Sequence, residues 1–478
     1  MMQRKVRLWI AVVSVCLITR PATPANAQAS GTLWESPVVL FDAGQSGKVF
    51  NPLVVEDTEG RIKILWETTV AAESGALANG IYCVDGDGTQ WSPALDVIRA
   101  QHGGRTYWPR YAIDTYGRIH LVWVGPNATL YYSRAPSAEA CNAQSWKTVA
   151  IPIRYQVLYS DIVVDAQDTI HIVFAVRGSD VYYIRSTDDG FSWTNHVPVS
   201  SVQPTAATSF PSLAVDRSGR IYVAWEENRL PDGVPSLGLY YAVSQDREQI
   251  WSAPVRFSQG SGQYTQPTVV ALEDGTVHFL WNGRISTRGR YHQWSADGGI
   301  TWSTISEFVP KTMGGGQTGP PGFAIDSAGM LNIVVGTDDT TYALWTGHSW
   351  MPAYDIASFG TYGNMEDQNI CVAQGHVLYA VANAALRQII LIRGVADVPE
   401  VVPEFRIPPT LPPEQILATV TADPVRQSVP FSRSVAYPLS SESSNPPSDS
   451  FDPIIISTGL AALIVVEIVI ASWRHRRI

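Results

Sequence analysis

Arginine, carboxylate and aromatic side chains recur at related places along this chain, and this mixture suits the binding of a sugar. Sugar rings stack on aromatic faces, and their hydroxyl groups need fixed polar partners. An arginine can hold a carboxylate through two parallel hydrogen bonds. The candidate site residues of these types are Trp108, Arg110, Arg154, Asp161, Glu226, Glu227, Tyr264 and Arg284.

Other kinds of chemistry have no comparable pattern in the sequence. The formal net charge of −10 argues against a nucleic-acid partner, because phosphate binding needs clustered lysine and arginine. There is no zinc-spaced cysteine and histidine cluster, phosphate-binding loop or nucleophile elbow, so we expect no metal and no cofactor. His120, His171 and His278 recur at one place in a repeated segment, and we expect them on strand surfaces rather than around a metal.

A segment that recurs seven times positions these residues. Two of its copies read WPRYAIDTYGRIHLVWV from Trp108 and FPSLAVDRSGRIYVAWE from Phe210. Apolar residues alternate with period two on either side of a turn such as Asp-x-x-Gly, which predicts a β-hairpin. The copies are spaced by roughly 46–57 residues, the size of a four-stranded propeller blade. We therefore predict an all-β fold, a seven-bladed β-propeller.

A second hairpin follows each copy, and two of these carry a recognisable turn. Ser186–Trp193 and Ser295–Trp302 resemble the Asp box, the S-x-D-x-G-x-T-W turn of sialidases and related propellers, and residues 84–91 are a weaker copy. The resemblance covers about residues 30–395 and implies a sialidase-like BNR-repeat propeller. In such a turn the Asp accepts backbone hydrogen bonds and the Trp packs between sheets. The structural Asp-box residues are then Asp188, Gly190, Trp193, Asp297, Gly299 and Trp302.

The two ends of the repeat region predict how the ring closes. Repeat seven lacks a visible last strand, and residues 33–40 near the N-terminus resemble the last strand of other blades. We predict that this N-terminal strand completes blade seven and closes the ring, because closure removes exposed sheet edges. Six blades, the number found in the sialidases, is the alternative.

The repeat also predicts which loops share a face. The hairpin turns and Asp boxes must lie on one face, so residues before first strands and after second strands lie on the other. Ligands of propellers usually bind on that second face near the central channel, which is an analogy of fold. Besides the candidates above, this face carries Tyr159, Glu366 and Asp367.

The sialidase resemblance implies specific roles for these candidates. Sialidases hold a carboxylate with three arginines, for which Arg110, Arg154 and Arg284 are the candidates. They use a tyrosine nucleophile activated by a glutamate and an aspartate acid/base, a departure from the usual pair of carboxylates. Tyr264 with Glu226 and Asp161 would take these roles, with Trp108 and Glu227 as further substrate contacts. The alternative is that Arg110 and Glu226 merely pair with their neighbours.

One further match to the sialidases counts against catalysis. Phe405-Arg406-Ile407-Pro408 is the string that sialidases carry near the start of their first blade. Here it follows the last blade, where its arginine would not reach the channel, so we interpret it as a chance match. The string is absent from residues 40–60.

Composition outside the repeats predicts export and anchoring. We expect a signal peptide at 1–27, the propeller at 28–397, a Pro/Ser-rich disordered stalk at 398–453, one transmembrane helix at 454–473 and a basic cytoplasmic tail at 474–478. The propeller would then lie outside the cell membrane. An exported chain can form a disulfide, and we expect one between Cys83 and Cys141, with Cys371 as a buried free thiol.

Two functions follow from this reading. The first is a membrane-anchored extracellular protein that acts on or binds a glycan or glycoconjugate, either as an exo-glycosidase of terminal acidic sugars or as a descendant without activity. The second is a propeller scaffold without enzymatic activity that recognises a protein, such as an envelope protein, at the cell surface.

Overall fold

The computed structural model describes residues 32–71, 77–100, 106–201, 206–229, 236–244, 250–258, 264–283, 288–310, 313 and 319–406. The predicted signal peptide, transmembrane helix and cytoplasmic tail lie outside these residues, as does most of the predicted stalk. No helix within the described residues is long and apolar enough to cross a membrane.

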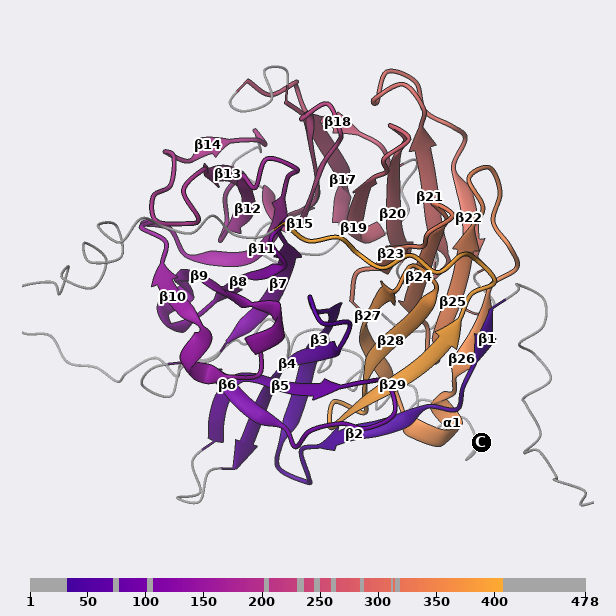
Figure 1. Cartoon of the computed structure of the whole chain (residues 1–478). Helices are drawn as coiled ribbons and strands as arrows, with labels where there is room; N and C mark the ends of the chain where they lie inside the picture. The colour runs from indigo at the N-terminus through magenta and orange to yellow at the C-terminus, as the bar shows by residue number, and fades with distance from the viewer. Residues whose placement is uncertain are drawn as a thin grey trace, which may run out of the picture. The chain divides into compact units, whose positions relative to one another are not determined.

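Seven antiparallel sheets form the seven blades of a β-propeller, and the fold is all-β apart from short helical turns (Figure 1). The prediction of seven blades is confirmed, and six is wrong. Blades one to six are four-stranded sheets in chain order. Blades one and two consist of β3 (Lys48–Glu56), β4 (Ile62–Ala71), β5 (Leu77–Gly86) and β6 (Leu95–Arg99), and of β7 (Tyr107–Ile113), β8 (Arg118–Val124), β9 (Leu130–Pro136) and β10 (Lys147–Ala150). Blades three and four consist of β11 (Val157–Val164), β12 (Ile170–Val176), β13 (Val181–Ser186) and β14 (Val197–Pro198), and of β15 (Ala206–Val215), β16 (Ile221–Arg229), β17 (Ser236–Val243) and β18 (Val255–Arg256). Blades five and six consist of β19 (Tyr264–Ala271), β20 (Val277–Gly283), β21 (Arg290–Ser295) and β22 (Ser306–Val309), and of β23 (Gly322–Ile325), β24 (Leu331–Gly336), β25 (Thr340–Trp345) and β26 (Tyr354–Ala357).

Blade seven is closed by the N-terminal part of the chain, as predicted. Its inner strands are β27 (Met365–Ala373), β28 (Val377–Ala384) and β29 (Gln388–Val395), preceded by the single turn α1 (Phe359–Tyr362). Both β1 (Leu33–Trp34) and β2 (Val38–Asp42) pair antiparallel with β29. The first and last strands of the described chain therefore share one sheet.

Apolar packing between blades holds the ring together. Each of seven hydrophobic clusters in the described residues joins two successive blades, and one of them joins blade seven back to blade one. Second strands are buried on both faces; all seven residues of β12, for example, are buried. Such burial on both sides explains why these strands are almost continuously apolar.

The two Asp boxes have the structural role that the resemblance implies. Asp297 accepts hydrogen bonds from the backbone N–H (2.8 Å) and hydroxyl (2.6 Å) of Thr301, and these bonds lower its pKa to about 2. Gly299 has a φ of 88°, which the turn requires and glycine tolerates. Trp302 donates to the Tyr241 hydroxyl in the preceding blade at 3.1 Å, so it packs between sheets as expected.

The second Asp box repeats this arrangement in blade three. Asp188 accepts a bond from the Ser192 backbone N–H at 2.9 Å, and Gly190 has a φ of 79°. The Trp193 ring meets Tyr132 of blade two edge-on, with ring centres 5.3 Å apart.

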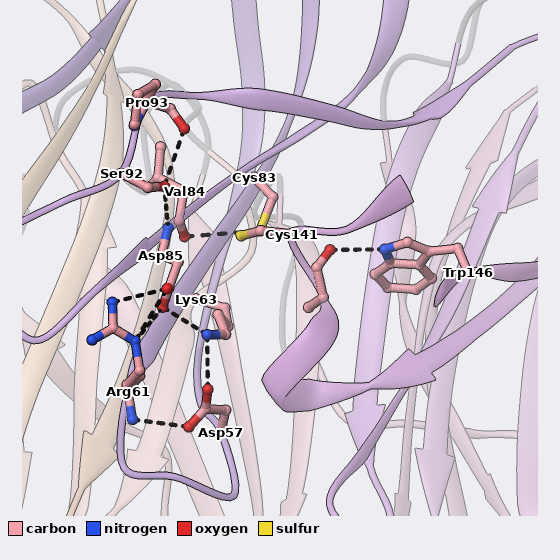
Figure 2. The surroundings of a disulfide bond; sticks show 11 residues. Asp57, Arg61, Lys63, Cys83, Val84, Asp85, Ser92, Pro93, Cys141 and Trp146 are labelled. Atoms are coloured by element: carbon pink, nitrogen blue, oxygen red, sulfur yellow. Dashed lines mark hydrogen bonds and ion pairs between the residues drawn. A yellow bond between two sulfur atoms is a disulfide. The ribbon is translucent and has the colours of Figure 1, made fainter. Parts of the chain in front are cut away.

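A disulfide joins blades one and two. Cys83 on β5 is bonded to Cys141, which follows β9, across a Cα–Cα distance of 5.2 Å (Figure 2). The predicted pairing is therefore confirmed. Beside it, Lys63 bonds Asp57 at 2.8 Å and Asp85 at 2.6 Å, which anchors the weaker Asp-box turn. Cys371 is free, and burial raises the pKa of its thiol.

The recurring histidines are buried, so the expectation of a strand surface is wrong. His120 bonds Asp114 of the hairpin turn at 3.0 Å and the Tyr132 hydroxyl of the next strand at 2.6 Å. His171 repeats the arrangement one blade later, with Asp165 and Tyr183. The turn aspartate needs a buried donor at this position, and a histidine can bond two partners at once. Among the described residues, no group of His, Cys, Asp and Glu is arranged to hold a metal.

The chain beyond β29 lies against the turn face of the propeller. We call residues 398–406 the strap; Figure 1 shows this yellow-orange segment crossing the ring. The Val401 N–H donates to the Gln374 carbonyl at 2.8 Å in blade seven, and the Arg406 N–H donates to the Thr115 carbonyl at 2.7 Å in blade two. The first residues of the predicted stalk, together with half of the Phe-Arg-Ile-Pro string, thus belong to the propeller unit.

Candidate functional site

A cavity of about 320 Å³ runs between the innermost strands of all seven blades. Every blade contributes residues to its wall, so this cavity is the central channel of the propeller. The residues that line it are Asn51, Pro52, Leu53, Trp108, Arg110, Tyr111, Ala112, Asp161, Ile162, Val163, Val164, Phe210, Pro211, Ser212, Leu213, Pro267, Thr268, Val269, Pro320, Pro321, Gly322, Phe323, Asp367, Gln368 and Asn369.

A repeated bulge in the innermost strands shapes the channel. In five blades the residue at the same place in the repeat has a positive φ of 46–53° although it is not glycine. The pairing register with the second strand shifts at each of these places. A bulge redirects side chains, and left-handed backbone at residues other than glycine is characteristic of functional sites. The five residues are Asn51, Trp108, Phe210, Gln266 and Asp367.

Three aromatic rings cluster at this bulge position in blades two, three and four. The Trp108 ring centre lies 5.0 Å from that of Tyr159 and 5.4 Å from that of Phe210, and the Tyr159 and Phe210 ring centres are 4.3 Å apart. All three side chains are partly exposed. We call Trp108, Tyr159 and Phe210 the aromatic cluster.

Arg110 lies beside this cluster, two residues after the bulge of blade two. Its guanidinium carbon is 4.5 Å from the centre of the Trp108 ring, within the range of a cation–π contact. Its Nη1 donates to the Pro109 carbonyl at 3.0 Å. Burial lowers the pKa of Arg110, and the negative charges of Asp161 and Asp367 oppose that change.

Asp161 occupies the same position in blade three as Arg110 does in blade two. Its carboxylate accepts hydrogen bonds from the backbone N–H of Leu213 at 2.9 Å and of Ile162 at 3.0 Å. Burial raises the pKa of Asp161 to about 6, although Arg110 and these hydrogen bonds act in the opposite direction. The site therefore holds a carboxyl group whose proton exchanges near neutral pH.

Two further carboxyl groups come from blade seven. Asp367 accepts hydrogen bonds from the Asn51 backbone N–H at 3.3 Å and the Asn383 side chain at 2.9 Å, and burial raises its pKa. Burial and the neighbouring Asp367 raise the pKa of Glu366 to about 7, while a hydrogen bond from Asn364 opposes this.

The structure thus brings together some of the residues selected from the sequence. Trp108, Arg110 and Asp161 all line the channel. Phe210 and Asp367 also line the channel, and the Tyr159 ring packs against Trp108 and Phe210. The sequence placed Tyr159 and Asp367 on this face without a specific role, and it did not select Phe210. Their shared place in the repeat is the signal that could have identified them, because residues at one repeat position converge around the axis.

The predicted nucleophile, Tyr264, and the glutamate predicted to activate it, Glu226, are not among the residues that line the channel. Tyr264 packs edge-on against Trp281 and Tyr291, with ring centres 6.4 and 5.4 Å away. Burial raises the pKa of the Tyr264 phenol, with a contribution from Glu307, which disfavours the phenolate that a nucleophile needs. Glu226 is fully buried and accepts a hydrogen bond from the hydroxyl of Thr265 at 2.6 Å.

The remaining candidates are dispersed. Glu227 is half-buried on β16 and accepts a hydrogen bond from the Trp225 indole at 3.2 Å, and burial raises its pKa. Arg154 is exposed in the loop before β11. Arg284 lies outside the described residues. Arg110 is therefore the only one of the three predicted clamp arginines that the described structure places in the channel.

Comparison with known proteins is consistent with this architecture. The family model of the BNR repeat-like domain matches residues 22–279, more than half of the chain. The chain belongs to the BNR repeat-like domain family. This membership confirms the sialidase-like repeat that the Asp boxes indicated.

Solved structures share the fold of this BNR repeat-like chain at low sequence identity. An ulvan lyase, a polysaccharide lyase, is 13% identical with a TM-score of 0.51, and the match covers 77% of this chain and 96% of that one. A protein of unknown function from Dyadobacter fermentans is 14% identical with a TM-score of 0.49, covering 77% and 99%. A Hadza microbial sialidase is 14% identical with a TM-score of 0.39, covering 72% and 65%. No curated protein matches the sequence significantly.

Proposed function

We propose that this BNR repeat-like propeller binds a glycan at the mouth of its central channel. The aromatic cluster supports this proposal most directly. Partly exposed rings beside fixed hydrogen-bonding groups are the combination that sugar recognition requires. Arg110, Asp161 and Asp367 lie in the same cavity and would bond sugar hydroxyl groups. The shared fold with a polysaccharide lyase is consistent with a glycan ligand.

We also propose that the propeller is held outside a cell membrane. The basis is the sequence alone: an apolar segment at 454–473 of sufficient length, followed by a basic tail, and a signal-like N-terminus. In this arrangement the channel would face glycans of the cell surface or its surroundings.

Hydrolysis is a second candidate function, and Asp161 favours it. A carboxyl group with a pKa of about 6 can donate a proton at neutral pH, which is the property of a general acid. Asp367 is a second carboxyl group in the same cavity, so a pair of carboxylates fits the described channel better than the Tyr264–Glu226 pair. Asp161→Asn would abolish such hydrolysis, whereas Tyr264→Phe would leave it unchanged.

Binding can be tested with the full-length chain and a panel of fluorescently labelled oligosaccharides. Trp108→Ala should weaken the affinity for any oligosaccharide that binds by about two- to tenfold, because a packed aromatic ring contributes about 0.5–1.5 kcal/mol beyond its buried area. Phe191→Ala is the matched control, since Phe191 is an exposed aromatic residue in an Asp-box turn, 72% accessible. Equal loss in both variants, or no binding by the wild type, would contradict glycan binding at the channel.

Hydrolysis is tested separately with a fluorogenic sialoside and with matched arabinosides and glucosides. Turnover that survives Asp161→Asn but not Tyr264→Phe or Glu226→Gln would favour the sialidase mechanism implied by the resemblance. Absence of turnover together with oligosaccharide binding would leave a glycan-binding protein. Absence of both would favour the protein-recognition scaffold.

A further inference from the structure

The charges of the channel wall are unequal. Within the described residues, the charged side chains that line the cavity are one arginine, Arg110, and two aspartates, Asp161 and Asp367. Glu366, the chain neighbour of Asp367, is a further carboxyl group that interacts electrostatically with it. The lining therefore has one negative charge in excess when both aspartates are ionised.

Arg110 is the single cation of the described lining, and it already has neighbours of opposite charge. Both aspartates act electrostatically on Arg110 and favour its charged form. One of its N–H groups donates to the Pro109 carbonyl, and its guanidinium carbon lies over the Trp108 ring. A ligand carboxylate would have to compete with two protein carboxylates for this single cation.

The aspartates are held in place. Two backbone N–H groups fix Asp161, and the Asn51 backbone and the Asn383 side chain fix Asp367. Neither carboxylate can swing away from an incoming anion without giving up these bonds. Each still has unused lone pairs, which can accept hydrogen bonds from sugar hydroxyl groups.

From this charge arrangement we infer that the channel selects neutral sugars over sugars that carry a carboxylate or sulfate group. The inference rests on the proposed glycan binding and adds the substrate class. Like charges placed together at a binding site are a strong means of rejecting a ligand. A neutral ring can stack on the aromatic cluster and donate hydroxyl hydrogens to Asp161 and Asp367 without that penalty.

The test uses full-length protein and matched pairs of labelled oligosaccharides. Each pair has the same linkage and length but differs in one acidic group: oligomers of glucose and glucuronate, mannose and mannuronate, galactose and galacturonate, and lactose with sialyllactose. In every pair that binds at pH 8, the neutral member should bind at least about tenfold more tightly. Raising NaCl from 50 to 500 mM should narrow this ratio, because salt screens the repulsion.

Asp367→Asn provides an independent measurement. It removes one negative charge and can keep an acceptor for the Asn51 backbone, so the ratio of neutral to acidic affinity should fall at least about fivefold. Glu273→Gln makes the same change of charge at an exposed residue on a hairpin turn of blade five, and should leave the ratio unchanged. An acidic member that binds as tightly as its neutral partner would overturn the inference while glycan binding stands. No binding by either class would overturn the proposed function as well.

Discussion

The guanidinium of Arg110 lies 4.5 Å from the centre of the Trp108 ring, and the two side chains leave the same bulged strand two residues apart. This contact couples the aromatic part of the channel to its charged part. Arg110 is also the common positive neighbour of Asp161 and Asp367. Changes at this residue should therefore affect both ligand binding and the protonation of the channel.

Replacing Arg110 by glutamine should destabilise the protein more at high pH than at low pH. Without the arginine the pKa values of Asp161 and Asp367 rise further, because Arg110 lowers both. Above these pKa values the carboxylates are ionised without the compensating charge, and below them they are neutral. We expect the free energy of unfolding to fall by about 2 kcal/mol at pH 8, less than for a fully buried pair because the channel is partly open to water.

Urea denaturation at pH 5 and pH 8 would measure this effect. Arg154→Gln is the control, because it removes an exposed arginine from the loop before β11. If the two variants lose equal stability at both pH values, Arg110 does not compensate the channel carboxylates.

Asp161 should make the protein less stable as the pH rises from about 4 to 6. Its pKa is about 6 in the folded state, against about 3.9 in an unfolded chain, so the folded state binds more protons in this window. The free energy of unfolding then decreases with rising pH, by up to about 3 kcal/mol from this group. Asp161→Asn should flatten the pH dependence in thermal or denaturant melts, and Glu273→Gln should not.

In contrast to Asp161, the aspartates of the Asp-box turns should make the protein less stable as the pH falls, in the range below about pH 4. Hydrogen bonds lower the pKa of Asp87 and Asp297 to about 2. A carboxylate of this kind stabilises the folded state above its unfolded pKa, and this contribution is lost as the pH falls from about 4 to 2. Melts over this range should show a fall in stability that Asp161→Asn leaves unchanged and Asp297→Asn reduces.

Loss of the Cys83–Cys141 disulfide should destabilise blades one and two. The bond joins residues separated by 58 positions, so its removal enlarges the unfolded ensemble and should cost about 2–4 kcal/mol. The double variant Cys83→Ser/Cys141→Ser should melt earlier than the wild type, with no further shift on addition of a reductant. Cys371→Ser should keep the sensitivity to reductant; if it loses it, the assigned pairing is wrong.

The strap should contribute measurably to the stability of the ring. The Phe405 ring lies so close to Gly117 that a methyl group built on that glycine would be 3.1 Å from it. Phe405→Ala should therefore lower the free energy of unfolding by about 1 kcal/mol through lost apolar contact. Val402 lies in the same segment but is 69% exposed, so Val402→Ala should have no effect. If chemical denaturation gives Phe405→Ala and Val402→Ala the same free energy of unfolding, the strap does not stabilise the propeller.

The contents of the channel depended on a feature that periodicity does not reveal. Trp108, Arg110 and Asp161 could be selected from the sequence because repeat position predicts which residues face the axis. The bulge at Phe210 and Asp367 breaks the period-two alternation within each first strand. The alternation of an ideal strand therefore does not show that both side chains line the channel, although their repeat position places them near the axis. Tyr264 illustrates the same limit, since its position before the bulge of β19 directs it against Trp281 and Tyr291.

The sequence by itself determined the all-β class, the seven blades, the closing N-terminal strand, the Asp boxes and the disulfide, because each depends on local pattern repeated at fixed spacing. Only the tertiary structure decided that the recurring histidines are buried, that the strap crosses the turn face, and that Arg110 lines the same cavity as two aspartates from different blades. These outcomes depend on which residues from distant blades meet around one axis. The energy of a buried charge is set by such neighbours, so no single segment contains it.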